Sequence, residues 1–172
     1  MKLKLVLIFS LFYVFYHSAN AQNNAVGLQL GGGFISSISP DVGAFSSSFF
    51  YERYINPATA IRFSFVYTGD YNMIVPNTRK KYEPFIKGIT VSGINHVPLN
   101  NLFYVEPGIG LAALNDRIFN GKSEWGYGVL FSLGWGRRVD NISYSANAEY
   151  ALTFTASNPK YFSLTLQGRY FF

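Results

Sequence analysis

The chain has 172 residues, a formal net charge of +5, no cysteine, and 19% aromatic but only 13% charged residues. Soluble domains average about 25% charged residues, so this composition argues against an ordinary soluble domain. The lack of cysteine excludes disulfides, thiol chemistry and an anchor on an acylated cysteine. The mild positive charge forms no basic stripe, so we expect no nucleic-acid partner.

Residues 1–21 have the pattern of a secretory signal peptide. Lys2 and Lys4 give a positive start, an apolar run covers residues 5–16, and Ala19-Asn20-Ala21 is a small-x-small cleavage site. The alternative is a transmembrane anchor, but the apolar run is shorter than the roughly 20 residues that a spanning helix needs. We therefore expect export and a second, mature domain at residues 22–172.

After the signal segment, eight stretches alternate between apolar and polar residues, which is the period of a β-strand with one apolar face. They cover residues 25–34, 43–54, 60–68, 85–96, 102–114, 124–137, 142–154 and 161–172. The third stretch is regular, because Ile61 and Phe63 alternate with Arg62 and Ser64. No stretch of the mature chain has convincing helical periodicity.

Two of these strands contain an irregularity. In residues 85–96, Lys87 falls on the same face as Ile89, and a bulge near Gly88 would restore the phase. In residues 102–114, Pro107 falls on the apolar face. Because proline cannot donate a ladder hydrogen bond, a bulge or a missing bond is expected there.

The last strand, residues 161–172, is the most regular of the eight and ends the chain on Phe172. Its apolar face holds Phe162, Leu164, Leu166, Tyr170 and Phe172, and its polar face holds Ser163, Thr165, Gln167 and Arg169. A free edge this apolar invites aggregation in water. Pairing with the first strand in a closed barrel removes the edge, and a membrane solvates the apolar face.

Connector lengths favour the same architecture. The connectors after the second, fourth and sixth strands are short, and most of the others are longer, as in outer-membrane barrels with short periplasmic turns. The predicted fold is therefore all-β, an eight-stranded antiparallel up-and-down transmembrane β-barrel. The alternative is a soluble, lipocalin-like ligand-binding barrel, whose apolar residues would point into the lumen. The deciding side chains are those of Phe63, Phe65, Val129, Phe131, Leu164 and Leu166.

The cleavage site, the eight alternating strands and the terminal Phe172 resemble the small outer-membrane β-barrels of Gram-negative bacteria, of the OmpA-like and OmpX-like type. The resemblance covers nearly all of residues 22–172. It implies a monomer in the outer membrane, in contact with its lipid and lipopolysaccharide. It also implies that Tyr170 and Phe172 carry an insertion signal read by the barrel-assembly machinery. The alternative is that both residues only cover the barrel wall near the interface.

Five charged residues fall on the predicted inward face: Glu52, Arg62, Glu106, Glu149 and Arg169. A basic residue on the lipid face at the bilayer midplane costs about 2–4 kcal/mol, whereas opposite charges inside the barrel can pair. The lumen of an eight-stranded barrel is just wide enough for side chains. We therefore expect a structural ion-pair network, with a gate or proton path as the alternative.

Little in the sequence points to catalysis or to a cofactor. His96 is the one histidine after the signal segment, and a single histidine without cysteine makes a zinc site improbable. Lipid A deacylases of this barrel class have a His-x-Ser arrangement, but Val97 and Pro98 follow His96 here. We expect a structural or surface-interaction role, with a narrow gated channel or a lipid A-modifying enzyme as alternatives.

One cluster of basic residues, Arg79-Lys80-Lys81, lies on the long third connector. On a cell surface these side chains would meet lipopolysaccharide phosphates, which Arg and Lys bind well. The alternative is a solvated loop without a defined partner.

Overall fold

The computed structural model describes residues 24–37, 41–71, 84–117, 124–154 and 158–172. Its strands are β1 (Asn24–Ser36), β2 (Val42–Asn56), β3 (Thr59–Asp70), β4 (Phe85–Asn95), β5 (Val97–Pro98), β6 (Phe103–Arg117), β7 (Glu124–Val139), β8 (Ile142–Thr153) and β9 (Lys160–Phe171). Eight of them are long, and β5 is a two-residue continuation of β4. No helix in the described ranges is long and apolar enough to cross a membrane.

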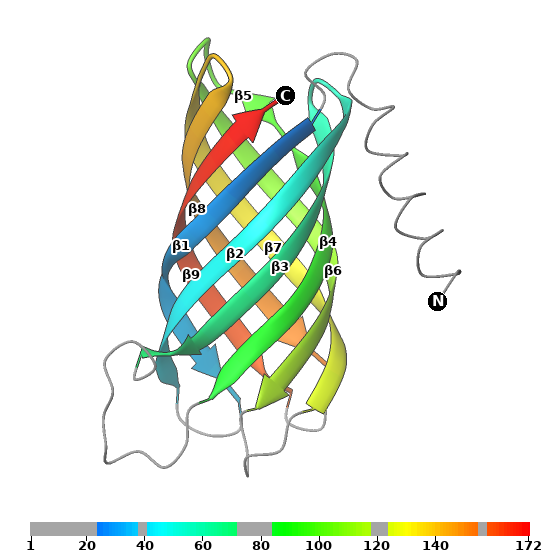
Figure 1. The fold of residues 1–172 in the computed structure, drawn as a ribbon, viewed down its shortest axis with the longest axis vertical. Helices are drawn as coiled ribbons and strands as arrows, with labels where there is room; N and C mark the ends of the chain where they lie inside the picture. Colours follow the sequence, from blue (N-terminus) through cyan, green and yellow to red (C-terminus); the bar gives the residue numbers. More distant parts are fainter. Residues whose placement is uncertain (1–23, 38–40, 72–83, 118–123, 155–157) are drawn as a thin grey trace, which may run out of the picture.

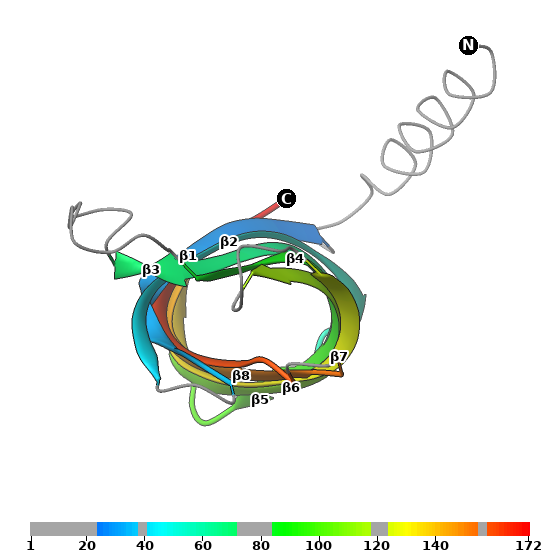
Figure 2. The same ribbon diagram turned by 90° about the horizontal axis from the view of Figure 1, so that it is seen from below.

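The strands form one closed antiparallel barrel, which confirms the predicted fold class (Figures 1 and 2). Each strand pairs with its neighbours in chain order, and β4 and β5 together form one wall strand beside β6. The barrel closes where β9 pairs with β1 in a register that runs from Ala25 opposite Phe171 to Ser36 opposite Lys160. The apolar terminal strand therefore has no free edge, as its sequence predicted.

The two ends of the barrel differ in their connections. Short turns join β2 to β3, β5 to β6 and β7 to β8 at the end where β1 starts and β9 finishes (Figure 1). We call this the turn end. The other connectors leave from the opposite end, here called the loop end. This short-and-long alternation is the pattern that the sequence predicted.

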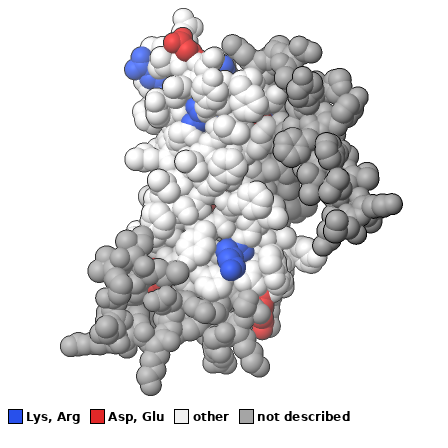
Figure 3. Space-filling model, in the orientation of Figure 1, with Lys and Arg blue, Asp and Glu red and all other residues white. Residues whose placement is uncertain are grey.

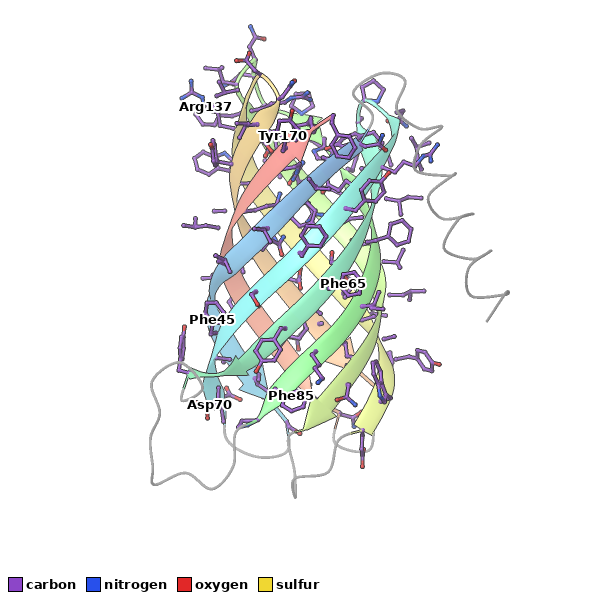
Figure 4. All side chains as sticks on the ribbon, in the orientation of Figure 1. Phe45, Phe65, Asp70, Phe85, Arg137 and Tyr170 are labelled. Atoms are coloured by element: carbon purple, nitrogen blue, oxygen red, sulfur yellow. The ribbon has the colours of Figure 1, made fainter. Side chains whose placement is uncertain are left out.

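The apolar faces of the strands point outward. Phe63, Phe65, Phe131, Leu164 and Leu166 are between 45% and 74% exposed. Figure 4 shows Phe65 projecting away from the barrel wall. A lipocalin-like barrel would turn these side chains into its lumen, so the structure excludes that alternative.

The expected bulge near Gly88 is wrong. The register between β3 and β4 runs without a shift from Gly69 opposite Phe85 to Thr59 opposite Asn95. Lys87 therefore does point outward, with its Nζ atom 5.0 Å from the centroid of the Phe85 ring. Because β4 begins at Phe85, Lys87 lies close to the loop end, where a long side chain can direct its charge out of the apolar band. The strand needs no bulge.

Pro107 produces a gap in the ladder without a register shift. Ile94 pairs with Gly108 and Val97 pairs with Val105, so the numbering offset is unchanged across the break at His96. On the other side of the strand, the His96 amide donates to the carbonyl oxygen of Ala58 at 2.6 Å, which continues the register between β3 and β4. Of the two expectations for Pro107, the missing ladder bond is the one observed.

Candidate functional site

Four of the inward charged residues meet near the turn end of the lumen. Arg62 Nε donates to Glu52 Oε1 at 2.6 Å, and Arg169 Nε lies 3.3 Å from Glu52 Oε2. Arg169 also donates through Nη1 and Nη2 to the two carboxylate oxygens of Glu106, at 2.6 and 2.7 Å. Arg62 Nη2 lies 3.8 Å from Glu106 Oε2. Two acids and two bases thus form one buried cluster, here called the ionic layer.

The positions of these residues follow from the registers. Glu52 and Arg62 are direct partners on the neighbouring strands β2 and β3. Arg169 lies on β9 and Glu106 on β6, with β8 and β7 between them in the wall. Their two-bonded pair therefore crosses the lumen. Such a planar fork is among the stronger interactions between side chains, and it fixes the separation of the two walls.

Tyr54 and His96 extend the ionic layer towards the turn end. His96 Nδ1 lies 2.6 Å from Glu106 Oε1, and His96 Nε2 lies 2.9 Å from the Tyr54 hydroxyl. Arg169 Nη1 donates to the same hydroxyl at 3.1 Å. Neither Tyr54 nor His96 was among the residues predicted for this cluster from the sequence. Tyr54 does share the inward parity of Glu52, so alternation alone would have supplied that candidate.

Glu149, the fifth predicted member, has a different partner. It is buried, and its carboxylate accepts a hydrogen bond from the Tyr161 hydroxyl of the neighbouring strand β9. The expected five-residue network is therefore four charged residues held together, with Glu149 bonded to a neutral phenol. Alternation predicted the face of Glu149 but not its partner.

A group of neutral polar side chains lies next to the ionic layer, on its loop-end side. Gln29 and Gln167 are direct partners on β1 and β9, and Gln29 Nε2 donates to Gln167 Oε1 at 2.7 Å. Ser48 Oγ donates to Gln29 Oε1 at 2.8 Å. Both amide atoms of Gln29 are therefore hydrogen-bonded, as buried polar groups usually are, whereas Gln167 Nε2 has no hydrogen-bond partner among the described residues.

The lumen nearer the loop end holds a cluster of buried, mostly apolar side chains, each at most 7% exposed, which we call the apolar layer. Its members are Ile35, Ala44, Val66, Ile86, Ala112, Leu114, Leu130, Ala151 and Tyr161. Buried polar side chains lie in the same half of the barrel, among them Thr68, Thr153 and Glu149. The inward residues singled out from the sequence were all charged, so this layer was not predicted. The alternation could have predicted it, because Ile35, Ile86 and Leu114 fall on the inward faces of their strands.

Tyr170 and Phe172 lie on the outer wall at the turn end, 51% and 50% exposed. Phe172 is held by its backbone, since its amide donates to the carbonyl of Asn24 at 2.9 Å. Figure 4 shows Tyr170 near this end of the barrel. The positions suit wall residues and a terminal signal alike, so the insertion signal stays a prediction.

Other predicted features fall elsewhere. Arg79, Lys80 and Lys81 lie outside the described residues, as does the predicted signal segment, residues 1–21. Within the described ranges, no group of three or more His, Cys, Asp or Glu side chains is arranged to hold a metal ion.

Comparisons with known proteins show the fold. No family model matches the chain, and no curated protein matches it. The crystal structure of Neisserial surface protein A (NspA) is similar, with a TM-score of 0.71 and 17% identity over 87% of this chain and 97% of that one. Ail, the attachment invasion locus protein of Yersinia pestis, gives a TM-score of 0.60 and 11% identity over 88% and 100%. The outer-membrane protein AlkL gives 0.51 and 12% over 88% and 90%. The chain therefore has the fold of the small outer-membrane β-barrel proteins.

Proposed function

We propose that this chain is an integral outer-membrane barrel with a structural or surface-interaction role and no catalytic activity. The observation that carries the proposal is the apolar outer wall around a lumen filled with side chains. In water, this wall would be a continuous exposed apolar surface, far larger than the apolar patches of soluble monomers. A bilayer solvates it, and in the closed barrel every long strand pairs with a neighbour on both sides, so no strand presents a free edge to the lipid.

The distribution of outer charges supports a membrane location. On the face drawn in Figure 3, charged side chains lie towards the two ends and the band between them is uncharged. Lys87 and Lys160 lie near the loop end, and Arg53 and Arg137 near the turn end. Basic residues at the edges of an apolar band can reach the lipid headgroups.

A filled lumen supports a role without transport. The ionic layer crosses the barrel through Arg169 and Glu106, and the apolar layer blocks the remaining half. An ion would have to break a buried charge pair and then pass between packed, mostly apolar side chains that replace little of its hydration. Both steps are costly, so the closed barrel favours a structural or surface role over a gated channel.

The surroundings of His96 support the absence of catalysis. Both ring nitrogens are engaged, Nδ1 with Glu106 and Nε2 with Tyr54. Since Val97 and Pro98 follow it, the His-x-Ser arrangement of lipid A deacylases is missing.

The same proposal includes biogenesis and surface contacts. The signal peptide, cleaved after Ala21, directs export, and Tyr170 and Phe172 present the insertion signal to the barrel-assembly machinery. Arg79, Lys80 and Lys81 contact lipopolysaccharide phosphates at the cell surface. The chain is a monomer in the outer membrane.

Fractionation tests the proposal. The protein is expressed in a Gram-negative host, and membranes are separated and run on gels before and after boiling. A folded barrel in the outer-membrane fraction migrates differently before boiling. Recovery of folded protein in the soluble periplasmic fraction would overturn the proposal. Unchanged lipid A, measured by mass spectrometry with and without expression, is the expected result for a protein without catalytic activity.

A further inference from the structure

The outer wall carries an apolar groove of about 600 Å³ over β7, β8 and β9. Ala146 and Ala148 on β8 form its floor. One side is made by Leu133 and Trp135 on β7, and the other by Leu164 and Leu166 on β9. The groove is therefore a place where two small outward residues lie between larger ones.

The registers explain the shape of this groove. Ala146 lies between Trp135 and Leu166, and Ala148 lies between Leu133 and Leu164. The next outward residues along β8 are Tyr150 and Tyr144, so the small floor is two residues long and has a tyrosine at each end.

A second depression, of about 420 Å³, lies next to the groove on the side of the turn end. It surrounds Gly168, which is opposite Tyr144 on β8 and opposite Leu28 on β1. A Cβ atom added to Gly168 would have no other heavy atom within 4 Å. The two depressions are neighbours on the wall beside the barrel closure, since Leu166 and Gly168 are successive outward residues of β9, and we call the pair the apolar hollow.

One exposed cation lies at the turn-end side of this hollow. Arg137 is the next outward residue after Trp135 on β7, and it is opposite Tyr144. Figure 4 shows Arg137 projecting from the wall close to the turn end. From Leu133 to Arg137 the strand advances about 13 Å, so an apolar wall and a cation follow one another along a single strand.

We propose that the groove binds one acyl chain of a phospholipid whose phosphate group pairs with Arg137. This inference rests on the membrane location in the proposed function. The apolar lining of both depressions suits contact with a hydrocarbon chain. The guanidinium of an arginine binds a phosphate group through paired N–H donors. Outer-membrane barrels have short turns on the periplasmic side, so Arg137 faces the periplasmic leaflet, which is where phospholipid rather than lipopolysaccharide lies. The occupant is therefore a phospholipid.

The test measures phospholipid retained by the purified full-length barrel in detergent, using native mass spectrometry with added phosphatidylglycerol. Wild-type protein is expected to keep one molecule. The A146F/A148F variant fills the floor and is expected to keep none, and A146L is a milder version of the same change. Arg137→Gln is expected to weaken retention about tenfold, the scale of a lost hydrogen bond to a charged group.

Two matched variants control for general effects on the outer wall. Val91→Phe adds a ring to an outward position of β4, away from the groove, and Lys87→Gln removes an outer charge near the loop end. Both are expected to retain phosphatidylglycerol like wild type. Diacylglycerol, which has no phosphate, is expected to bind wild type as weakly as phosphatidylglycerol binds Arg137→Gln.

Equal retention by wild type and by A146F/A148F or A146L would overturn the inference. Equal binding of diacylglycerol and phosphatidylglycerol to wild type would do the same. A wild-type dimer in sedimentation that A146L dissociates would assign the groove to a second copy instead. The gel shift on boiling is recorded for each variant. Wild-type protein that is folded in the outer membrane but retains no phosphatidylglycerol counts against this inference alone, whereas absence of wild type from that membrane counts against the proposed function.

Discussion

At the scale of single residues, burying the charges of the ionic layer costs free energy, and contacts between opposite charges offset that cost. Glu52, Glu106 and Arg169 are each at most 3% exposed, so their charges have left water almost completely. Such groups are tolerated only when every charge has a partner of opposite sign. Arg62 and Arg169 both contact the two acids, but Arg169 donates two hydrogen bonds to Glu106, whereas Arg62 Nη2 lies 3.8 Å from that carboxylate. The charge balance therefore depends most on Arg169.

Replacing Arg169 by leucine is therefore expected to destabilise the barrel by about 3–5 kcal/mol, because Glu106 loses the partner that binds both of its carboxylate oxygens and Glu52 keeps only Arg62. Urea unfolding in lipid vesicles, followed by the gel shift on boiling, measures the change. Adding Glu106→Leu to Arg169→Leu removes one orphaned charge and is expected to recover part of the loss. If the free-energy losses of the two single variants simply add up in the double variant, the side chains of Arg169 and Glu106 are not coupled.

At the scale of strands, closure between β1 and β9 depends on close backbone approach. A Cβ atom on Gly33 would overlap the carbonyl oxygen of Phe162 on β9, and backbone cannot move aside as a flexible side chain can. Gly168, on the same pair of strands, has open space instead. Gly33 and Gly168 therefore allow the same substitution to be compared at a crowded and at an open position of the β1–β9 pairing.

Gly33→Ala is expected to destabilise the closed barrel by about 1–3 kcal/mol, the usual cost of forcing an extra group into a packed site. Gly168→Ala is expected to change the unfolding free energy by less than about 0.5 kcal/mol, as for other exposed positions. The same urea titration compares the two variants. A similar loss of stability in both would mean that closure tolerates no substitution at all, and would contradict this account of Gly33.

Phe172 allows assembly and stability to be separated. Its side chain is half exposed on the outer wall, so its deletion removes little packing inside the barrel. If it carries the insertion signal, deletion lowers outer-membrane levels several-fold in cells, while the protein refolded in vesicles keeps nearly wild-type stability. Unchanged outer-membrane levels in the deletion strain would show that Phe172 is not needed as an insertion signal, and would not affect the description of the fold.

Alternation along each strand predicted the fold and the facing of side chains, because parity decides which wall surface a residue occupies. It did not predict contacts across the lumen. Arg169 and Glu106 meet because the tilt and stagger of eight strands bring β9 and β6 to the same level, and no single strand encodes that stagger. The partner of Glu149 and the unbroken phase at Lys87 were missed for the same reason: both depend on neighbouring strands.

At the scale of the whole molecule, two different seals lie in series along the lumen. The ionic layer near the turn end excludes ions by occupying the lumen with paired charges. The apolar layer nearer the loop end obstructs them with packed, mostly apolar side chains, which replace little of an ion's hydration. Since either layer suffices to block an ion, loss of one should leave the barrel closed.

Planar-bilayer recordings are therefore expected to show no conductance steps for the wild type or for Glu106→Gln, which keeps the shape of the ionic layer. Leu114→Ala with Leu130→Ala opens space in the apolar layer but leaves the bridge of Arg169 and Glu106, so it too is expected to stay silent. Only the combination of both sets of substitutions should give discrete steps. Steps in the wild type or in Glu106→Gln would show that the ionic layer is a gate, and would replace a sealed barrel by a channel whose open state differs from the structure described.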